Sequence, residues 1–155
     1  MEKTIVMSVL DQKKVSYTPH YYGTEEGVGG MELAEILGQD PNHVFKTLVT
    51  VGSPNKYYVF DVPVNRELNL KKAAKAVGEK KIEMLKSKDL LPLTGYIHGG
   101  CSPIGMKKFF TTTFHHTAEN FGTIIFSAGK IGYQVELAID DLKKVIKLQT
   151  ADICD

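Results

Sequence analysis

The sequence predicts an α+β fold, a single compact domain in which a curled, mixed β-sheet is flanked by helices. Segments with strand and helix patterns follow one another without the regular strand–helix–strand order of a doubly wound sheet. The 155 residues suit one domain and can bury a substantial core. The composition, 43% hydrophobic and 24% charged, is typical of a soluble globular protein. We therefore expect residues 1–155 to form one domain.

In the first half of the chain, apolar residues at helical spacing indicate helices, and runs of aromatic and β-branched residues indicate strands. Asn69 is placed to cap a helix that Gly78 ends, and the turn at Gly52–Asn55 joins two strands as a hairpin. The expected helices span residues 2–14, 31–37 and 70–77, the expected strands span residues 15–22, 44–51 and 56–64, and a flexible acidic loop spans Gly23–Gly30.

The second half contains more strands. Ser87, followed by Lys88 and Asp89, predicts a short capped helix that ends before Pro92. Asp140 is placed to cap a final helix that continues to about Leu148, and the last residues, TADICD, are expected to be a tail. The expected strands span residues 109–115, 123–127 and 132–139, with a helical turn at residues 118–121.

The stretch Gly95–Lys108, GYIHGGCSPIGMKK, contains four glycines and one proline. Glycine permits positive φ and close approach to the backbone, so a shaped loop of exposed amides is expected, with a tight connector as the alternative. Cys101 has His98 three residues before it, which gives weak support for a cysteine nucleophile. Ser102 lies outside any Gly-x-Ser-x-Gly motif.

Lys46 lies within an otherwise apolar strand, VFKTLV at residues 44–49. Alternation puts Val44, Lys46 and Leu48 on one face and Phe45, Thr47 and Val49 on the other, so neither face suits water. We interpret Lys46 as a fixed cation at the lip of a pocket, where it binds a phosphate or a developing oxyanion. The alternative is an edge-strand lysine that prevents aggregation.

Positive charge is concentrated between residues 71 and 88, where seven lysines face two glutamates. Lys71, Lys72 and Lys75 could contact nucleic-acid phosphates, although a solvated helix face explains them as well. Arg66 is the only arginine, so any nucleic-acid binding should be sensitive to salt and weakly sequence-specific.

Several functional classes are not supported by the sequence. His115 and His116 would point to opposite faces of a strand, and neither the histidines nor the two cysteines have the spacing of metal ligands, so we expect no metal and no cofactor. No apolar run approaches the roughly 20 residues of a membrane span, and the N-terminus is not a signal peptide, so we expect no membrane contact and a cytoplasmic location.

Four motifs taken together resemble one family. They are FKTL at residues 45–48, LNLKKAAK at residues 68–75, the glycine loop Gly95–Lys108, and Ser127–Lys130 followed by Val135 and Glu136. The chain is similar, over nearly its whole length, to the YbaK-type Cys-tRNA(Pro)/Cys-tRNA(Cys) deacylases. These are related to the editing domain inserted in some bacterial prolyl-tRNA synthetases.

The resemblance implies a trans-editing deacylase that binds the aminoacylated 3′ end of tRNA, with prolyl-tRNA synthetase as a transient partner. Tyr22 matches the pocket tyrosine, with Tyr21 as the alternative register, and Ala128 and Ile131 depart from the family pattern. The implied sites are Lys46 as catalytic residue, Tyr22, Gly99, Gly100, Cys101, Ser102, Gly105, Ser127, Gly129 and Lys130 as substrate-binding residues, and Lys71, Lys72 and Lys75 as contacts to the tRNA backbone.

The family mechanism implies that the cysteinyl thiol of the substrate attacks its own ester carbonyl, so the protein would supply geometry and no nucleophile. Two alternatives stay open. One is a deacylase for another small aminoacyl group, such as alanyl, that uses an activated water. The other is a non-catalytic module that binds tRNA ends or nucleotides, for which Lys71, Lys72 and Lys75 would matter more than Lys46.

Overall fold

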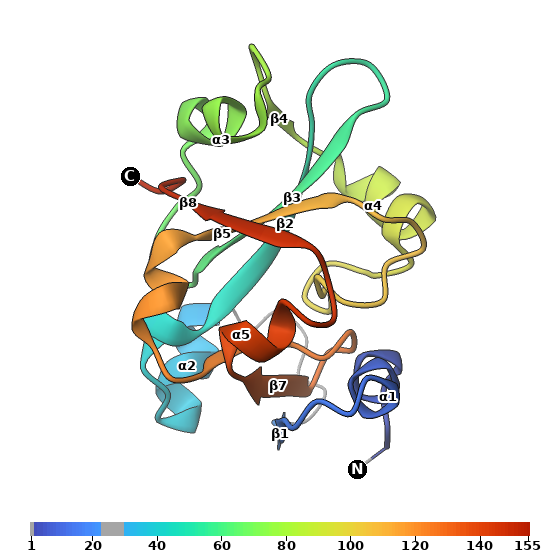
Figure 1. Ribbon diagram of the computed structural model, residues 1–155, viewed down its shortest axis with the longest axis vertical. Helices are drawn as coiled ribbons and strands as arrows, with labels where there is room; N and C mark the ends of the chain where they lie inside the picture. The colour runs from blue at the N-terminus through green and yellow to red at the C-terminus, as the bar shows by residue number, and fades with distance from the viewer. Residues whose placement is uncertain (1, 23–29) are drawn as a thin grey trace.

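In the computed structural model, which describes residues 2–22 and 30–155, the strands form two sheets (Figure 1). The larger sheet has the strand order β4-β2-β3-β5-β8 and the smaller one β1-β7-β6. The strands are β1 (Thr18–Tyr21), β2 (Phe45–Val51), β3 (Tyr57–Pro63), β4 (Glu83–Met84), β5 (Thr111–His115), β6 (Ile124–Ser127), β7 (Tyr133–Leu137) and β8 (Leu148–Ala151).

The α+β class is confirmed, because antiparallel and parallel pairs coexist in the larger sheet. The strands are divided between two sheets, however, and do not make the single curled sheet that was predicted. The loop predicted at Gly23–Gly30 lies, apart from Gly30, outside the described residues.

Short helices flank the sheets. The predicted cap of α3 (Leu70–Val77) is confirmed, since the Asn69 side chain accepts a hydrogen bond from the Lys72 N–H at 3.0 Å and Gly78 ends the helix at φ 75°. The other helices are α1 (Ile5–Gln12), α2 (Gly30–Leu37), α4 (Ser87–Thr94) and α5 (Ile139–Leu142), with 3-10 turns η1 (Pro41–His43) and η2 (His116–Asn120).

The core lies on both faces of the larger sheet. Between the two sheets, Phe114 packs against Phe45 and Phe126 with ring centroids 5.6 and 6.3 Å apart. On the opposite face, Phe60 and Val62 pack against α3. The strands at the centre of the molecule are therefore buried on both sides, which fixes the register of the hairpin that carries Lys46.

The β2–β3 hairpin is confirmed and runs in register from Phe45 opposite Pro63 to Val51 opposite Tyr57. On its other side β2 pairs with β4 at Thr50 and Val51, and Val44, directly before the strand, forms a bridge with Ile125 of β6. The middle of β2 therefore has an open edge, and this edge borders the cavity described below.

The predicted start and end of the helix near Pro92 were wrong. The helix expected to stop before Pro92 continues through it to Thr94, and Ser87 is its first residue and not its cap. A proline within a helix removes one backbone hydrogen bond. Gly95, at φ 86°, ends the helix instead.

The C-terminal prediction was also wrong. The helix expected from Asp140 to about Leu148 is only the single turn α5, and Leu148 begins β8, which pairs in parallel with β5. The expected tail belongs to the fold, because Ile153 and Cys154 are buried and Cys154 bridges to Leu68. Pairing with a distant strand outweighed the local helical pattern, which single-segment periodicity cannot show.

No helix in the described part of the chain is long and apolar enough to cross a membrane.

Candidate functional site

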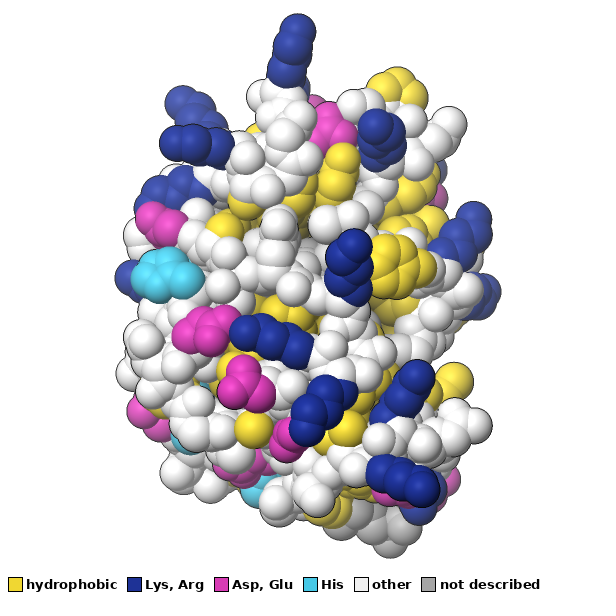
Figure 2. Space-filling view, in the orientation of Figure 1, with side chains coloured by type: hydrophobic (Ala, Val, Ile, Leu, Met, Phe, Trp, Pro, Cys, Tyr) yellow, Lys and Arg dark blue, Asp and Glu magenta, His cyan; other side chains and the backbone are white. Residues whose placement is uncertain are grey.

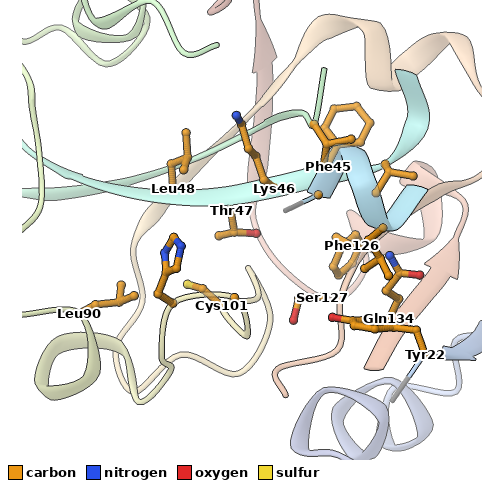
Figure 3. A pocket seen from close by; sticks show the side chains of 16 residues that line it. Tyr22, Phe45, Lys46, Thr47, Leu48, Leu90, Cys101, Phe126, Ser127 and Gln134 are labelled. Atoms are coloured by element: carbon orange, nitrogen blue, oxygen red, sulfur yellow. The ribbon is translucent and has the colours of Figure 1, made fainter. Parts of the chain in front are cut away.

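A cavity of about 270 Å³ lies between the open edge of β2, the glycine loop and the β6–β7 turn (Figure 3). Residues from distant parts of the sequence line it together. They are Tyr22, Gly30, Leu33, Val44, Phe45, Lys46, Thr47, Leu48, Val64, Leu90, His98, Gly99, Cys101, Phe126, Ser127 and Gln134. The lining is mostly apolar with a few polar groups, which is typical of a small-molecule site.

Lys46 lies at the rim of this cavity. Figure 3 shows its side chain on the side of β2 that faces away from Cys101 and Ser127. Its Nζ atom is 3.5 Å from Glu67 Oε1, and the Glu67 side chain is 81% exposed. An exposed ion pair of this length contributes little stability, so the ammonium can exchange Glu67 for an anionic ligand.

Thr47 lies on the opposite side of β2 and faces the cavity interior (Figure 3). Its hydroxyl donates a hydrogen bond to Asp61 Oδ1 at 2.5 Å, across the paired strands β2 and β3. Asp61 is fully buried, and burial raises its pKa to about 8, with the Thr47 hydrogen bond as a smaller opposing effect. The carboxyl is therefore mainly protonated at neutral pH.

Cys101 lines the same cavity, but its thiol is not activated. Burial, and secondarily the proximity of Asp61, raises the pKa of Cys101 to about 12. Because the thiolate is the nucleophilic form, a thiol held neutral is a poor nucleophile. This does not support the cysteine-nucleophile interpretation, although His98 and Cys101 both line the cavity.

The predicted glycines divide into two groups. Gly99, at φ 86°, lines the cavity, whereas Gly100, Gly105 and Gly129 do not. A Cβ atom on Gly100 would lie 3.2 Å from the Ile131 backbone nitrogen, and one on Gly105 would lie 2.8 Å from the Tyr96 hydroxyl. The structure thus gives these two glycines a packing role, because a side chain would be crowded at Gly100 and would force the Tyr96 hydroxyl to shift at Gly105.

Ser127 lines the cavity and its hydroxyl oxygen accepts a hydrogen bond from the Gly129 N–H at 3.1 Å. The Ser127 hydroxyl hydrogen is left to donate elsewhere. Lys130 points away from the lining, where it pairs with Glu2 and lies 5.6 Å from the centre of the Tyr133 ring. Ser102, within the loop, is fully buried and accepts a hydrogen bond from the Ile104 N–H.

The two candidate tyrosines are separated by the fold. Tyr22 lines the cavity and its N–H donates to the Gly132 carbonyl at 2.9 Å. Tyr21 packs edge-on against Tyr133, with ring centroids 5.0 Å apart. The Tyr22 register is therefore the one that brings an aromatic side chain to the cavity.

The three α3 lysines also differ. Lys72 is held by Asp152 at 2.9 Å and by the Cys154 carbonyl at 2.8 Å, whereas Lys71 and Lys75 are exposed. Figure 2 shows cationic side chains gathered at the upper left, where Figure 1 places α3. Lys71 and Lys75 are thus available to an external anion, while Lys72 is engaged by the C-terminal segment.

The expectation that His115 and His116 point to opposite faces was wrong, because β5 ends between them. Their ring centroids are 4.5 Å apart, and their donor atoms cluster with those of Asp152. Arg66 contacts His115 Nε2 at 2.7 Å, however, and Lys72 pairs with Asp152. Two cations occupy atoms that a metal ion would need, so we assign no metal to this cluster.

Sequence reasoning missed Asp61 and Gln134, and it considered His98 only as a weak partner for Cys101. His98 and Gln134 line the cavity, and Asp61 lies behind Thr47. The signal for Asp61 was present in the sequence, since an acidic residue between Phe60 and Val62 interrupts an otherwise apolar strand. Gln134 gave no signal, because its place in the cavity wall depends on pairing between β1, β6 and β7.

Comparisons with known proteins agree on one family. The model of the aminoacyl-tRNA editing domain matches residues 25–145. The chain is also 46% identical, over 98% of its own length and 93% of the relative's, to the Enterococcus faecalis protein EbsC, which is named for Cys-tRNA(Pro)/Cys-tRNA(Cys) deacylase activity.

Solved structures share the fold. A crystal structure described as a trans-editing enzyme for prolyl-tRNA synthetase superposes with a TM-score of 0.82 at 21% identity, covering 97% of this chain and 94% of that one. A second, described as a hypothetical protein, superposes with a TM-score of 0.87 at 18% identity, covering 99% of this chain and 100% of that one.

Proposed function

This chain belongs to the aminoacyl-tRNA editing domain family and is an aminoacyl-tRNA deacylase of the trans-editing kind, and we propose that its substrate is mischarged cysteinyl-tRNA(Pro). The observation that carries the proposal is the composition of the cavity. A cation stands at its rim, polar groups line its wall, and its own thiol is held neutral. Such a site can hold an ester without attacking it.

The size of the cavity suits a small acyl group. Its volume of about 270 Å³ is below the roughly 300–1,000 Å³ of pockets that hold drug-sized ligands. Leu33, Val64 and Phe126 contribute apolar lining that can contact an aliphatic or thiol side chain. Lys46 projects from the outer side of β2, and its ammonium would leave Glu67 and turn to the rim to meet the phosphate or the ester oxygen of the terminal nucleotide.

In the proposed reaction, the substrate thiolate attacks the ester carbonyl carbon. A carbon–sulfur bond forms and the bond to the ribose oxygen breaks, so a cyclic thioester leaves, and the proton that the substrate thiol gave up ends on the ribose oxygen as the tRNA hydroxyl. Lys46 stabilises the negative charge that develops, and Ser127 and Tyr22 orient the terminal ribose. The protein contributes positioning, which agrees with a neutral Cys101.

The test compares tRNA charged with Cys, Ser or Ala, followed for loss of the ester bond. Thiol participation predicts fast loss of the Cys ester alone. Equal turnover of the Cys and Ser esters would contradict thiol participation, and no turnover of any ester would favour a binding module.

One observation favours a second substrate class. The exposed His98 imidazole lines the cavity and could accept a proton from a water molecule that attacks an alanyl ester. In that case the Ala ester would be lost fastest, and His98→Ala would abolish the activity. Under the cysteinyl proposal, the same variant keeps its activity on the Cys ester.

The proposal also covers the binding partners of the protein and its location in the cell. Lys71 and Lys75 would contact the acceptor-strand phosphates of tRNA. Prolyl-tRNA synthetase, as the source of the mischarged tRNA, would be a transient partner. Because aminoacyl-tRNA is made and used in the cytoplasm, we propose a cytoplasmic location.

A further inference from the structure

Asp61 is a carboxyl group that the proposed mechanism does not use. Its side chain is 0% exposed and lies on β3, directly opposite Thr47 of β2. Oδ1 accepts the hydrogen bond from Thr47, whereas Oδ2 is buried without a hydrogen-bond partner among the described residues. Burying a polar atom without a partner is costly, and such atoms in native structures call for an explanation.

The two carboxyl oxygens of Asp61 differ in protonation. At neutral pH the carboxyl is largely protonated. A proton on Oδ2 leaves Oδ1 as an acceptor, which is the role that the Thr47 bond requires. The titratable group that faces Asp61 is the Cys101 thiol from the glycine loop, and Tyr96 lies next to Cys101. Both neighbours are neutral, so the carboxyl has no cation to pair with.

The hydrogen bond determines what Thr47 can offer a ligand. Because its hydroxyl hydrogen points to Asp61, the lone pairs on Oγ1 are left as acceptors. The main-chain carbonyl of Thr47 is a second acceptor that is available to a ligand. The Val49 carbonyl bonds to Leu85 at the edge of β2 away from β3, and hydrogen-bonding directions alternate along a strand, so Thr47 directs its own carbonyl to that edge. β4 does not extend far enough to cover it.

We propose that Asp61 is a positioning residue, which holds the Thr47 hydroxyl so that Thr47 Oγ1 accepts a hydrogen bond from the amino group of the bound aminoacyl ester. The proposal rests on the proposed deacylase function and adds a group that recognises the amino acid backbone. An amino group can donate up to three hydrogen bonds, and Thr47 presents two acceptors, Oγ1 and the main-chain carbonyl. Recognition of the amino group would orient the acyl carbonyl relative to Lys46.

The experiment removes the donor from the substrate and the acceptor from the protein. Single-turnover deacylation is measured with Cys-tRNA and with 3-mercaptopropionyl-tRNA, which keeps the thiol and lacks the amino group. Wild type should use the analogue at least about 10-fold less well, because the analogue cannot make the hydrogen bonds that a charged amino group donates to Thr47. Thr47→Val removes Oγ1 and keeps the main-chain carbonyl, so it should lose part of this factor on Cys-tRNA and lose little on the analogue. Thr47→Ser should resemble wild type.

Asp61 is tested by comparing its variants on the same two substrates. Asp61→Leu should behave as Thr47→Val does, with a higher KM on Cys-tRNA and little change on the analogue, because the hydroxyl is no longer held. Asp61→Asn keeps an acceptor opposite Thr47 and should retain the preference for the amino group. If Asp61→Leu does not fold, the results for Asp61→Asn and Thr47→Val test the proposal in its place.

Equal losses of Thr47→Val on both substrates would overturn the proposal, as would loss of the preference in Asp61→Asn. The proposed function fails in a different way, namely when wild type releases neither thiol-bearing acyl group.

Discussion

Lys46 and Thr47 are adjacent in β2, yet their side chains lie in contrasting environments. Lys46 projects from the outer side of the strand and shares a long, exposed ion pair with Glu67. Thr47 projects inward and is bonded to a fully buried carboxyl that sits beside a neutral thiol. The same strand thus presents a charge to solvent on one side and a hydrogen-bonded hydroxyl to the cavity on the other.

This difference separates two kinds of contribution to the site. A charge at the rim can move to meet developing negative charge on the substrate, and little stability is lost when it leaves Glu67. A hydroxyl held by a buried partner is preorganised, because its direction is set before the ligand arrives. The following predictions remove one contribution at a time.

The largest effect is expected for Lys46→Ala. Loss of a group that stabilises developing charge typically lowers the rate by about 100-fold or more, so deacylation of Cys-tRNA should fall by at least that factor. The melting temperature should change little, because the pair with Glu67 is exposed. Lys56→Ala, at the exposed hairpin turn, is the matched control and should keep full activity. A fully active Lys46→Ala protein would remove Lys46 from the site.

The next effect concerns stability and pH. Burial raises the pKa of Asp61 to about 8, whereas an unfolded chain titrates this carboxyl near about pH 4. Between these values the folded protein holds a proton that the unfolded chain releases, so this group makes the wild type less stable as pH rises.

Asp61→Asn abolishes this titration. Relative to wild type, the variant should gain at least about 1 kcal/mol of unfolding free energy between pH 5 and pH 8. Urea unfolding at several pH values measures the gain. A constant difference across this range would show that Asp61 titrates normally and is not a neutral acid.

A smaller effect is expected outside the cavity. Replacing both Lys71 and Lys75 with Ala should raise the KM for charged tRNA a few-fold at low salt. The slope of log KM against log salt concentration should fall by the amount expected for about two lost phosphate contacts. The matched control replaces Lys144 and Lys147, which lie on the segment between α5 and β8. If both double variants weaken binding equally, α3 is not a specific contact surface for tRNA.

The smallest effect is expected for Cys101→Ser. Because the thiol is held neutral and has no assigned chemical role, deacylation should stay within about 3-fold of wild type, the range of a conservative change in packing. The rate is measured beside Lys46→Ala under the same conditions. An inactive Cys101→Ser protein that remains folded would restore the cysteine-nucleophile interpretation.

Local patterns in the sequence were sufficient for the elements whose stability is local. The α3 helix ends where Asn69 and Gly78 predict, and the β2–β3 hairpin is fixed by its own alternation and turn. The pattern failed for β8, because residues 148–151 become a strand only by pairing with β5, which lies far away in the sequence.

The same division applies to the site. Lys46 was conspicuous because a charge stands alone in an apolar strand, and the glycine loop was conspicuous by composition. The functional importance of Thr47 depends on Asp61, fourteen residues away, and becomes visible only in the paired register. Which glycines line the cavity and which permit packing is likewise a property of the folded chain.

The central claim is that the cavity positions an ester whose own thiol reacts. Its most direct test is the ratio of single-turnover rate constants for wild-type protein with Cys and Ser esters of the same tRNA, two substrates that differ by one atom. The account predicts that the Cys ester is lost at least about 100-fold faster, since only its side chain can attack the carbonyl. A ratio near one would contradict it.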